Sequence, residues 1–123
     1  MEKLLIVDDE PGMIRTLMVQ LAQEGVSVTQ ADRGEKAIQI CEHEPHKNAL
    51  IDYNMPGMNG VETAEALRRL IRNMFIVIYT CNGDLDAIRE ELKGKGISDI
   101  EVVNKSDVDI DFFRDKFPDI FQT

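Results

Sequence analysis

The sequence contains no tryptophan, two cysteines and four prolines in 123 residues. Two cysteines are too few for the disulfide framework of a small secreted protein, so Cys41 and Cys81, both in apolar runs, are predicted to be reduced core thiols. No apolar run approaches the roughly 20 residues that a membrane-spanning helix needs, and the run at residues 4–7 is too short for a signal peptide. We therefore expect a cytoplasmic protein without a membrane anchor.

Positive charge is also scarce: 14 lysines and arginines stand against 23 aspartates and glutamates, for a formal net charge of −9. Such a chain repels phosphate backbones and anionic lipid headgroups, so direct binding of nucleic acid or of a membrane surface is not expected. The hydrophobic share of 43% and the charged share of 30% are typical of a globular protein. The length predicts one domain over residues 1–123.

Short β-rich runs alternate with amphipathic helical stretches along the chain. This alternation predicts an α/β fold with a parallel sheet and helices on both faces, because right-handed crossovers place each helix against the sheet. Strands are predicted at residues 3–7, 26–31, 49–51, 75–79 and 100–103. Helices are predicted at residues 13–24, 34–42, 61–71, 85–93 and 107–117, the fourth capped by Asp84.

Polar residues with metal-binding or phosphate-binding chemistry follow four of the predicted strands. In parallel sheets, ligands bind at the carboxyl ends of the strands. Converging carboxylates repel one another unless a cation compensates them, and a set of oxygen ligands favours Mg²⁺, with Mn²⁺ as a substitute. A metal, a hydroxyl and an ammonium around one carboxylate suit a phosphoryl group on that carboxylate. The residues are Asp8 and Asp9 after the first strand, Asp52 after the third, Thr80 after the fourth and Lys105 after the fifth.

Four sequence segments together resemble the receiver domain of two-component response regulators. They are Leu-Leu-Ile-Val-Asp-Asp-Glu at residues 4–10, Asp-x-x-Met-Pro-x-x-x-Gly within residues 50–60, Ile-Tyr-Thr at residues 78–80, and Lys105. The resemblance covers nearly the whole chain. It implies a flavodoxin-like, doubly wound sheet of five parallel strands in the order 2-1-3-4-5, with five helices.

The resemblance also implies a role for each matching residue. Asp52 would accept a phosphoryl group from a histidine kinase or a phosphotransfer protein. The domain would then be no independent enzyme, but would promote only its own phosphorylation and dephosphorylation. The metal would be bound by Asp9, Asp52 and the backbone carbonyl of Asn54, with Asp8 acting through water, and the phosphoryl oxygens would be held by Thr80 and Lys105.

In the family, phosphorylation changes a surface formed by the fourth helix, the fifth strand and the fifth helix, here residues 84–93 and 100–117. An effector protein would bind there, and the domain would be a monomer or a phosphorylation-dependent dimer. Two alternatives use the same fold. One is a receiver-like interaction module that acts independently of phosphorylation, and the other is a Mg²⁺-dependent phosphohydrolase that uses the same carboxylates.

The chain departs from the family pattern near Lys105. Receivers usually have proline after this lysine, with a cis bond between them, but here Ser106 follows. We predict a trans bond, because a cis bond without proline costs about 2.5 to 4 kcal/mol. Val103 stands where the family often has the tyrosine or phenylalanine that moves together with the threonine. Asn54 and Asn82 occupy positions that flank the phosphorylation pocket in the family.

Three other patterns are assigned no site. His43 and His46 flank a proline and are predicted to lie in a solvated loop, not at a metal. The basic run within residues 68–72 is predicted to be an exposed helix face. Phe113 and Phe117 have helical spacing, which indicates core packing of the last helix, with a partner surface as the alternative.

Overall fold

Five parallel strands form one sheet in the order β2-β1-β3-β4-β5. The structure is a computed structural model that describes residues 3–10, 12–81 and 83–121. The strand order confirms the flavodoxin-like topology expected from the sequence. The strands are β1 (Lys3–Val7), β2 (Ser27–Ala31), β3 (Asn48–Asp52), β4 (Phe75–Thr80) and β5 (Glu101–Asn104).

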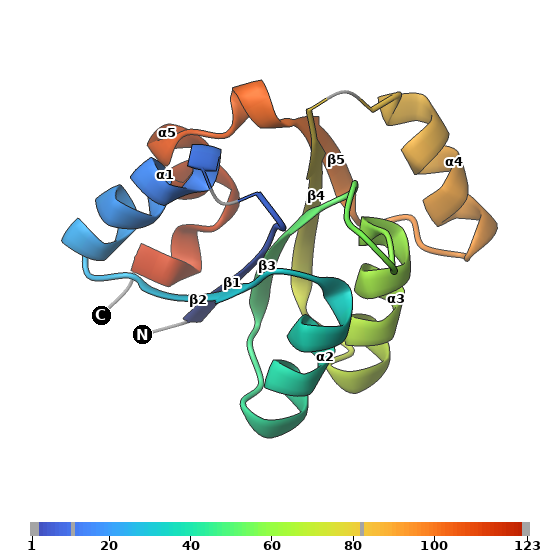
Figure 1. The fold of residues 1–123 in the computed structure, drawn as a ribbon, viewed down its shortest axis with the longest axis horizontal. Coiled ribbons are helices and arrows are strands. Elements are labelled where there is room, and N and C mark those ends of the chain that lie inside the picture. The colour runs from blue at the N-terminus through green and yellow to red at the C-terminus, as the bar shows by residue number, and fades with distance from the viewer. Residues whose placement is uncertain (1–2, 11, 82, 122–123) are drawn as a thin grey trace.

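Helices cover both faces of the sheet, so the fold is doubly wound (Figure 1). The helices α1 and α5 lie on one face, and α2, α3 and α4 lie on the other. Their bounds are α1 (Gly12–Gln23), α2 (Gly34–His43), α3 (Gly60–Leu70), α4 (Leu85–Gly94) and α5 (Ile110–Lys116), with short 3₁₀ helices η1 (Lys105–Asp107) and η2 (Pro118–Phe121).

The central strands are apolar on both faces, and their side chains alternate between two core clusters. In β1, Leu5 and Val7 point to the side of α2, α3 and α4, whereas Leu4 and Ile6 point to the side of α1 and α5. All four side chains are fully buried. The polar residues at the carboxyl ends of these parallel strands, Asp8, Asp52 and Thr80, lie at one edge of the sheet.

The last helix begins later than predicted. The sequence suggested a helix from Asp107, but residues 105–107 form the 3₁₀ helix η1, and α5 begins at Ile110. The side chain of Asp109 accepts a hydrogen bond from the backbone N–H of Phe112 at 2.8 Å, so Asp109 is the N-cap. Phe113 and Phe117 are buried, which confirms their packing in the core.

Two expectations about single side chains were wrong. His46 is only 1% exposed: its Nδ1–H donates to the Glu44 carbonyl oxygen at 2.8 Å, and its Nε2 lies 2.9 Å from the Thr29 hydroxyl oxygen. With both ring nitrogens bonded, the imidazole is stable in the interior. Cys41 is buried as predicted, but Cys81 is exposed because it follows the end of β4.

The basic run is exposed only in part. Arg69 and Arg72 are exposed, whereas Arg68 is half-buried, donates to the Met74 carbonyl oxygen at 2.8 Å and pairs with Asp99 at 3.1 Å. Over the residues placed by the structure, the helices lack the length and apolar character that crossing a bilayer requires.

Candidate functional site

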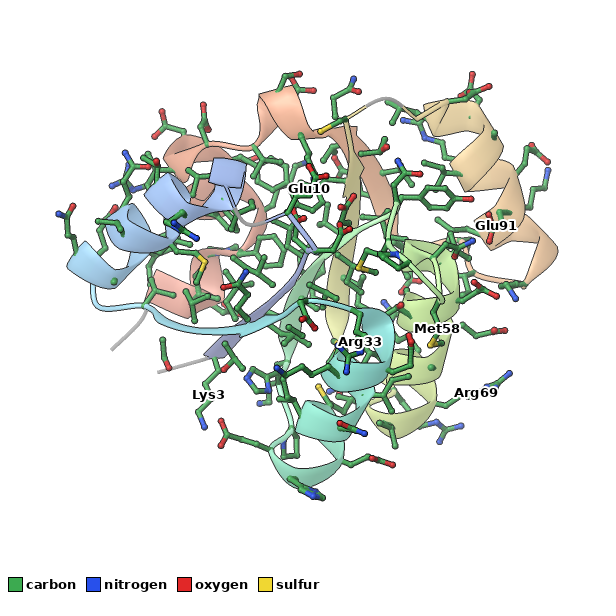
Figure 2. All side chains as sticks on the ribbon, viewed as in Figure 1. Lys3, Glu10, Arg33, Met58, Arg69 and Glu91 are labelled. Atoms are coloured by element: carbon green, nitrogen blue, oxygen red, sulfur yellow. The ribbon has the colours of Figure 1, made fainter. Side chains whose placement is uncertain are left out.

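Three carboxylates converge at the carboxyl edge of the sheet, as the sequence predicted. Asp8 and Asp9 follow β1, and Asp52 ends β3; one oxygen of each lies within 4.8 Å of the others. Asp8 and Asp52 are buried, and Asp9 is half-buried. Figure 2 shows Glu10 at this edge and Lys3 at the opposite end of the sheet.

The ammonium of Lys105 lies between the two buried carboxylates. Its Nζ is 3.1 Å from Oδ2 of Asp8 and 3.2 Å from Oδ2 of Asp52. Burial alone would lower the pKa of Lys105, but its hydrogen bonds to the two carboxylates and their negative charge outweigh burial and raise the pKa. Lys105 is therefore a fixed positive charge beside Asp52 at neutral pH.

Asp52 has a raised pKa but is still mostly ionised at pH 7. Burial and the negative charge of Asp8 raise its pKa to about 6, against the opposing effect of Lys105. The backbone N–H of Asn54 also donates to Asp52 Oδ1, at 3.2 Å, and holds the carboxylate in place. An ionised, oriented carboxylate can act as a nucleophile without a general base.

Thr80 ends β4, directly before Cys81, which lines a cavity at the site. Its buried hydroxyl oxygen accepts a hydrogen bond from the side-chain amide of Asn54 at 3.0 Å. The cavity has a volume of about 410 Å³, which is ample for a phosphoryl group. It is lined by Asp9, Glu10, Asp52, Asn54, Cys81, Gly83 and Lys105.

Two glycines allow the close packing around this cavity. A Cβ atom on Gly60 would lie 2.6 Å from the carbonyl oxygen of Asp52 and 2.8 Å from the Cα of Tyr53. A Cβ atom on Gly83 would lie 2.6 Å from the Thr80 hydroxyl oxygen. The final glycine of the Asp-x-x-Met-Pro-x-x-x-Gly motif is thus required by the backbone of Asp52 itself.

The loop after Asp52 is hydrogen-bonded to α4. Tyr53 donates from its hydroxyl to Glu91 at 2.6 Å, and the side-chain amide of Asn59 donates to the same carboxylate at 3.1 Å. The bond to Glu91 and partial burial raise the pKa of Tyr53 to about 12. Glu91 lies on the side of α4 that faces this loop (Figure 2). A residue adjacent to Asp52 thus contacts α4 directly.

The structure brings all the predicted site residues to one place. Asp8, Asp9 and Asp52 form the acidic cluster, and Thr80 and Lys105 border it. Asn54 belongs to the same loop as Asp52, and its side chain reaches Thr80. The roles assigned to these residues remain predictions.

The structure describes both residues at which the chain departs from the family pattern near Lys105, Ser106 and Val103. The Lys105–Ser106 peptide bond is trans, as predicted from the missing proline. Val103 is half-buried in β5. Asn82, which the family resemblance places beside the pocket, lies outside the described residues.

Sequence reasoning missed Tyr79, which is fully buried in β4. Its hydroxyl donates a hydrogen bond to Asp8 Oδ2, and the Lys105 Nζ lies 4.8 Å from its ring centroid. The available signal was a tyrosine hydroxyl directly after the apolar run at residues 75–78 and directly before Thr80. Its proximity to Asp8 depends on strand register, which the sequence does not state.

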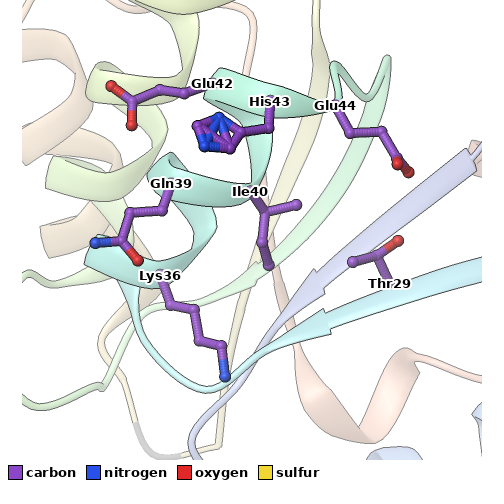
Figure 3. A pocket seen from close by; sticks show the side chains of 7 residues that line it. All are labelled: Thr29, Lys36, Gln39, Ile40, Glu42, His43 and Glu44. Carbon is purple, nitrogen blue, oxygen red and sulfur yellow. The ribbon is translucent and has the colours of Figure 1, made fainter.

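A larger cavity, of about 690 Å³, lies away from this site, between α2 and β2 (Figure 3). The residues that line it are exposed or half-buried, and none of them is among the predicted site residues. They are Thr29, Lys36, Gln39, Ile40, Glu42, His43 and Glu44. The chemistry of the acidic cluster therefore belongs to the smaller cavity.

Comparison with curated proteins finds relatives among bacterial regulators. The chain is 36% identical over 89 residues to the sporulation initiation phosphotransferase F of Bacillus subtilis (strain 168), which covers 72% of each protein. It is 34% identical over 93 residues to the nitrate/nitrite response regulator protein NarL of Escherichia coli (strain K12). That match covers 73% of the chain but only 43% of NarL, so the similarity concerns less than half of that regulator.

Solved structures share the fold over nearly the whole chain. The Thermotoga maritima response regulator protein TrrA, solved in complex with Mg(2+)-BeF, is 28% identical, with a TM-score of 0.78 and coverage of 98% of this chain and 99% of TrrA. A CheY-like receiver domain protein from Methanospirillum hungatei JF-1 has a TM-score of 0.81 at 23% identity, which shows the fold alone.

The family described as the response regulator receiver domain matches residues 4–107. This match includes the acidic cluster, Thr80 and Lys105. The sheet order and the carboxylates at its carboxyl edge agree with that assignment. The chain belongs to the response regulator receiver domain family.

Proposed function

We propose that this receiver domain accepts a phosphoryl group on Asp52 from a histidine kinase or phosphotransfer protein. The observation that carries the proposal is the position of Asp52, whose carboxylate borders a cavity of about 410 Å³ with the Lys105 ammonium 3.2 Å from one of its oxygens. A nucleophile and a compensating cation are thus in place where a phosphoryl group can enter.

The transfer follows from the chemistry of the residues. A carboxylate oxygen of Asp52 attacks the phosphorus atom of a phosphohistidine, an oxygen–phosphorus bond forms, and the nitrogen–phosphorus bond breaks. The electron pair of the broken bond returns to the partner's imidazole. Lys105 is placed to donate to the phosphoryl oxygens, and the Thr80 hydroxyl, which accepts a hydrogen bond from Asn54, still has its own hydrogen to donate to them.

The donor set of the site fits Mg²⁺, because three carboxylates lie within 4.8 Å of one another and no nitrogen or sulfur ligand is among them. Asp9, Asp52 and the backbone carbonyl of Asn54 would bind the ion directly, and Asp8 would act through water. Mn²⁺ is the expected substitute. The bound ion would supply positive charge to the oxygens of the transferring group.

The output of the domain would be a change in protein binding. Phosphorylation adds up to about two negative charges at the end of β3, next to the Asn54–Thr80 hydrogen bond. We propose that an effector binds the surface of α4, β5 and α5, that residues 1–123 act as one domain, and that it works in the cytoplasm. The domain would promote only its own phosphorylation and dephosphorylation.

Intact-mass measurement with a small phosphodonor and Mg²⁺ tests the proposal. We expect one added phosphoryl group on the wild type and on Asp119→Asn, and none on Asp52→Asn. Asp119 is the matched control, because it makes the same change of charge at an exposed position. Labelling of Asp52→Asn equal to the wild type would overturn the assignment.

Two further results would favour the alternatives. Rapid turnover of varied phosphoesters, without an accumulating adduct, would support a Mg²⁺-dependent phosphohydrolase. A pulldown that recovers the same partner in equal amount with and without phosphodonor would support a phosphorylation-independent interaction module. Sedimentation of the labelled and unlabelled protein distinguishes a constant monomer from a phosphorylation-dependent dimer.

A further inference from the structure

The backbone of Tyr79 adjoins three residues in or next to the site: Thr80, Asp52 and Tyr53. It is the residue before Thr80 in β4, it pairs in register with Asp52 of β3, and its carbonyl oxygen accepts the backbone N–H of Tyr53 at 2.9 Å. Its side chain is fully buried and points to the face of the sheet covered by α1 and α5. Packing alone would be satisfied by phenylalanine, so the hydroxyl calls for a separate explanation.

The hydroxyl of Tyr79 donates to Asp8, a carboxylate that is itself fully buried. Asp8 Oδ1 accepts the backbone N–H of Glu10 at 2.8 Å, and Oδ2 accepts both Tyr79 and the ammonium of Lys105, the latter at 3.1 Å. Three donors thus replace the water that an ionised carboxylate loses on burial. The carboxylate plane is fixed because both oxygens are held.

The ring of Tyr79 contacts the second charged group of the site. The Lys105 ammonium lies 4.8 Å from the ring centroid, within the range of a cation–π interaction. A lysine side chain has several rotatable bonds, so the two carboxylates beside the ammonium leave it free to shift from one to the other. The ring limits that movement and keeps the ammonium beside Asp52.

We propose that Tyr79 is a positioning residue for phosphorylation: its hydroxyl orients Asp8 toward the metal, and its ring holds the ammonium of Lys105 beside Asp52. This inference rests on the proposed function. It assigns the hydroxyl and the ring to separate tasks, which two substitutions can separate. Tyr79→Phe removes only the hydroxyl, whereas Tyr79→Leu removes the hydroxyl and the ring.

The first measurement is Mg²⁺ affinity by isothermal titration calorimetry of the unphosphorylated protein. We expect Tyr79→Phe to weaken Mg²⁺ binding by about tenfold, the lower end of the range for loss of a group that orients a metal ligand. The control is Tyr53→Phe, which removes the only other tyrosine hydroxyl of the chain and whose partner is Glu91, not a site carboxylate. Its Mg²⁺ affinity should equal that of the wild type.

The second measurement is the rate of labelling by a small phosphodonor at saturating Mg²⁺. Tyr79→Phe should keep this maximal rate within about twofold, because the ring still holds Lys105, and Tyr79→Leu should lower it by roughly tenfold or more. Circular dichroism establishes that both variants are folded. A purely structural role would change thermal stability without separating metal affinity from maximal rate.

The protein supplies its own spectroscopic reporter. It has no tryptophan and two tyrosines, so in Tyr53→Phe the tyrosine emission comes from Tyr79 alone. We expect this emission to change with added Mg²⁺ and to saturate at the calorimetric dissociation constant, whereas NaCl at equal ionic strength should leave it unchanged. Emission that does not respond to Mg²⁺ would contradict a link between the Tyr79 hydroxyl and the metal site.

The outcomes separate this inference from the function on which it rests. A wild type that binds Mg²⁺ but is never labelled overturns the proposed function and, with it, the role of Tyr79 in phosphorylation. A wild type that is labelled on Asp52, with a folded Tyr79→Phe of unchanged Mg²⁺ affinity, overturns the inference alone. Weaker Mg²⁺ binding in Tyr79→Phe together with a slow Tyr79→Leu supports both tasks.

Discussion

Asp52 should make the stability of the metal-free protein depend on pH. Burial and the charge of Asp8 raise its pKa from 3.8 to about 6. Because the pKa is higher in the folded than in the unfolded state, the folded state binds the proton more tightly, and the free energy of unfolding falls as pH rises from about 4 to 6. At about 1.4 kcal/mol per pKa unit, the ionised carboxylate costs the folded protein roughly 3 kcal/mol above pH 7.

Asp52→Asn isolates this contribution, because it removes the charge and keeps a side-chain oxygen that can accept from Lys105 or from the backbone N–H of Asn54. At about pH 7.5 the variant should be more stable than the wild type by up to roughly 3 kcal/mol. At about pH 5 most of the Asp52 carboxyl groups are protonated in the folded state, and the difference should shrink by about 1.4 kcal/mol.

Urea unfolding followed by circular dichroism, with a chelator present, measures both differences. The matched control is Asp119→Asn, which changes the net charge equally at an exposed position away from the site. Its stability relative to the wild type should be nearly the same at the two pH values. The reasoning fails if Asp52→Asn is no more stable than the wild type at the higher pH, or if its advantage does not change with pH.

Three other perturbations test the contacts around Asp52. Lys105→Met leaves two buried carboxylates without their cation, so we expect the chelated protein to lose about 3 kcal/mol of unfolding free energy and Mg²⁺ to restore it; unchanged stability in chelator would contradict this. Gly60→Ala places a Cβ atom against the Asp52 carbonyl and should lose roughly 1 to 3 kcal/mol in urea unfolding, whereas Gly94→Ala, with open space around it, should not. A double-mutant cycle of Tyr53→Phe and Glu91→Ala should give a coupling of about 0.5 to 1.5 kcal/mol, and additivity would refute the link to α4.

The strands and the acidic cluster were predictable because both depend on short-range patterns. Apolar, β-rich runs formed the strands, and the residues that ended them, such as Asp8, Asp52 and Thr80, lie at one edge once the sheet is parallel. Alternation of strands and helices was enough to imply a parallel sheet. The strand order came from the family resemblance, because many orders satisfy the same alternation.

Side chains whose surroundings come from distant segments were harder to predict. His46 was expected in solvent, but Thr29, 17 residues earlier in the chain, provides a partner for its ring nitrogen. The start of α5 was placed too early because Asp107 and Asp109 are equally good N-cap residues in sequence, and only the packed structure selects Asp109. Local propensity gives several candidate helix boundaries, and tertiary contacts determine which of them forms.

The local sequence pattern accounts for the burial of Tyr79 but not for its contact with Asp8. Its burial follows from the apolar run of β4, but a buried tyrosine needs an acceptor, and the sequence offers many carboxylates. The choice of Asp8 is set by two pairings, β1 with β3 and β3 with β4, which place the ends of these three strands together. The hydroxyl of Tyr79 in β4, which lies between β3 and β5, can therefore reach across the end of β3 to Asp8. Strand register, which no local pattern encodes, turns a core residue into a contact of the site.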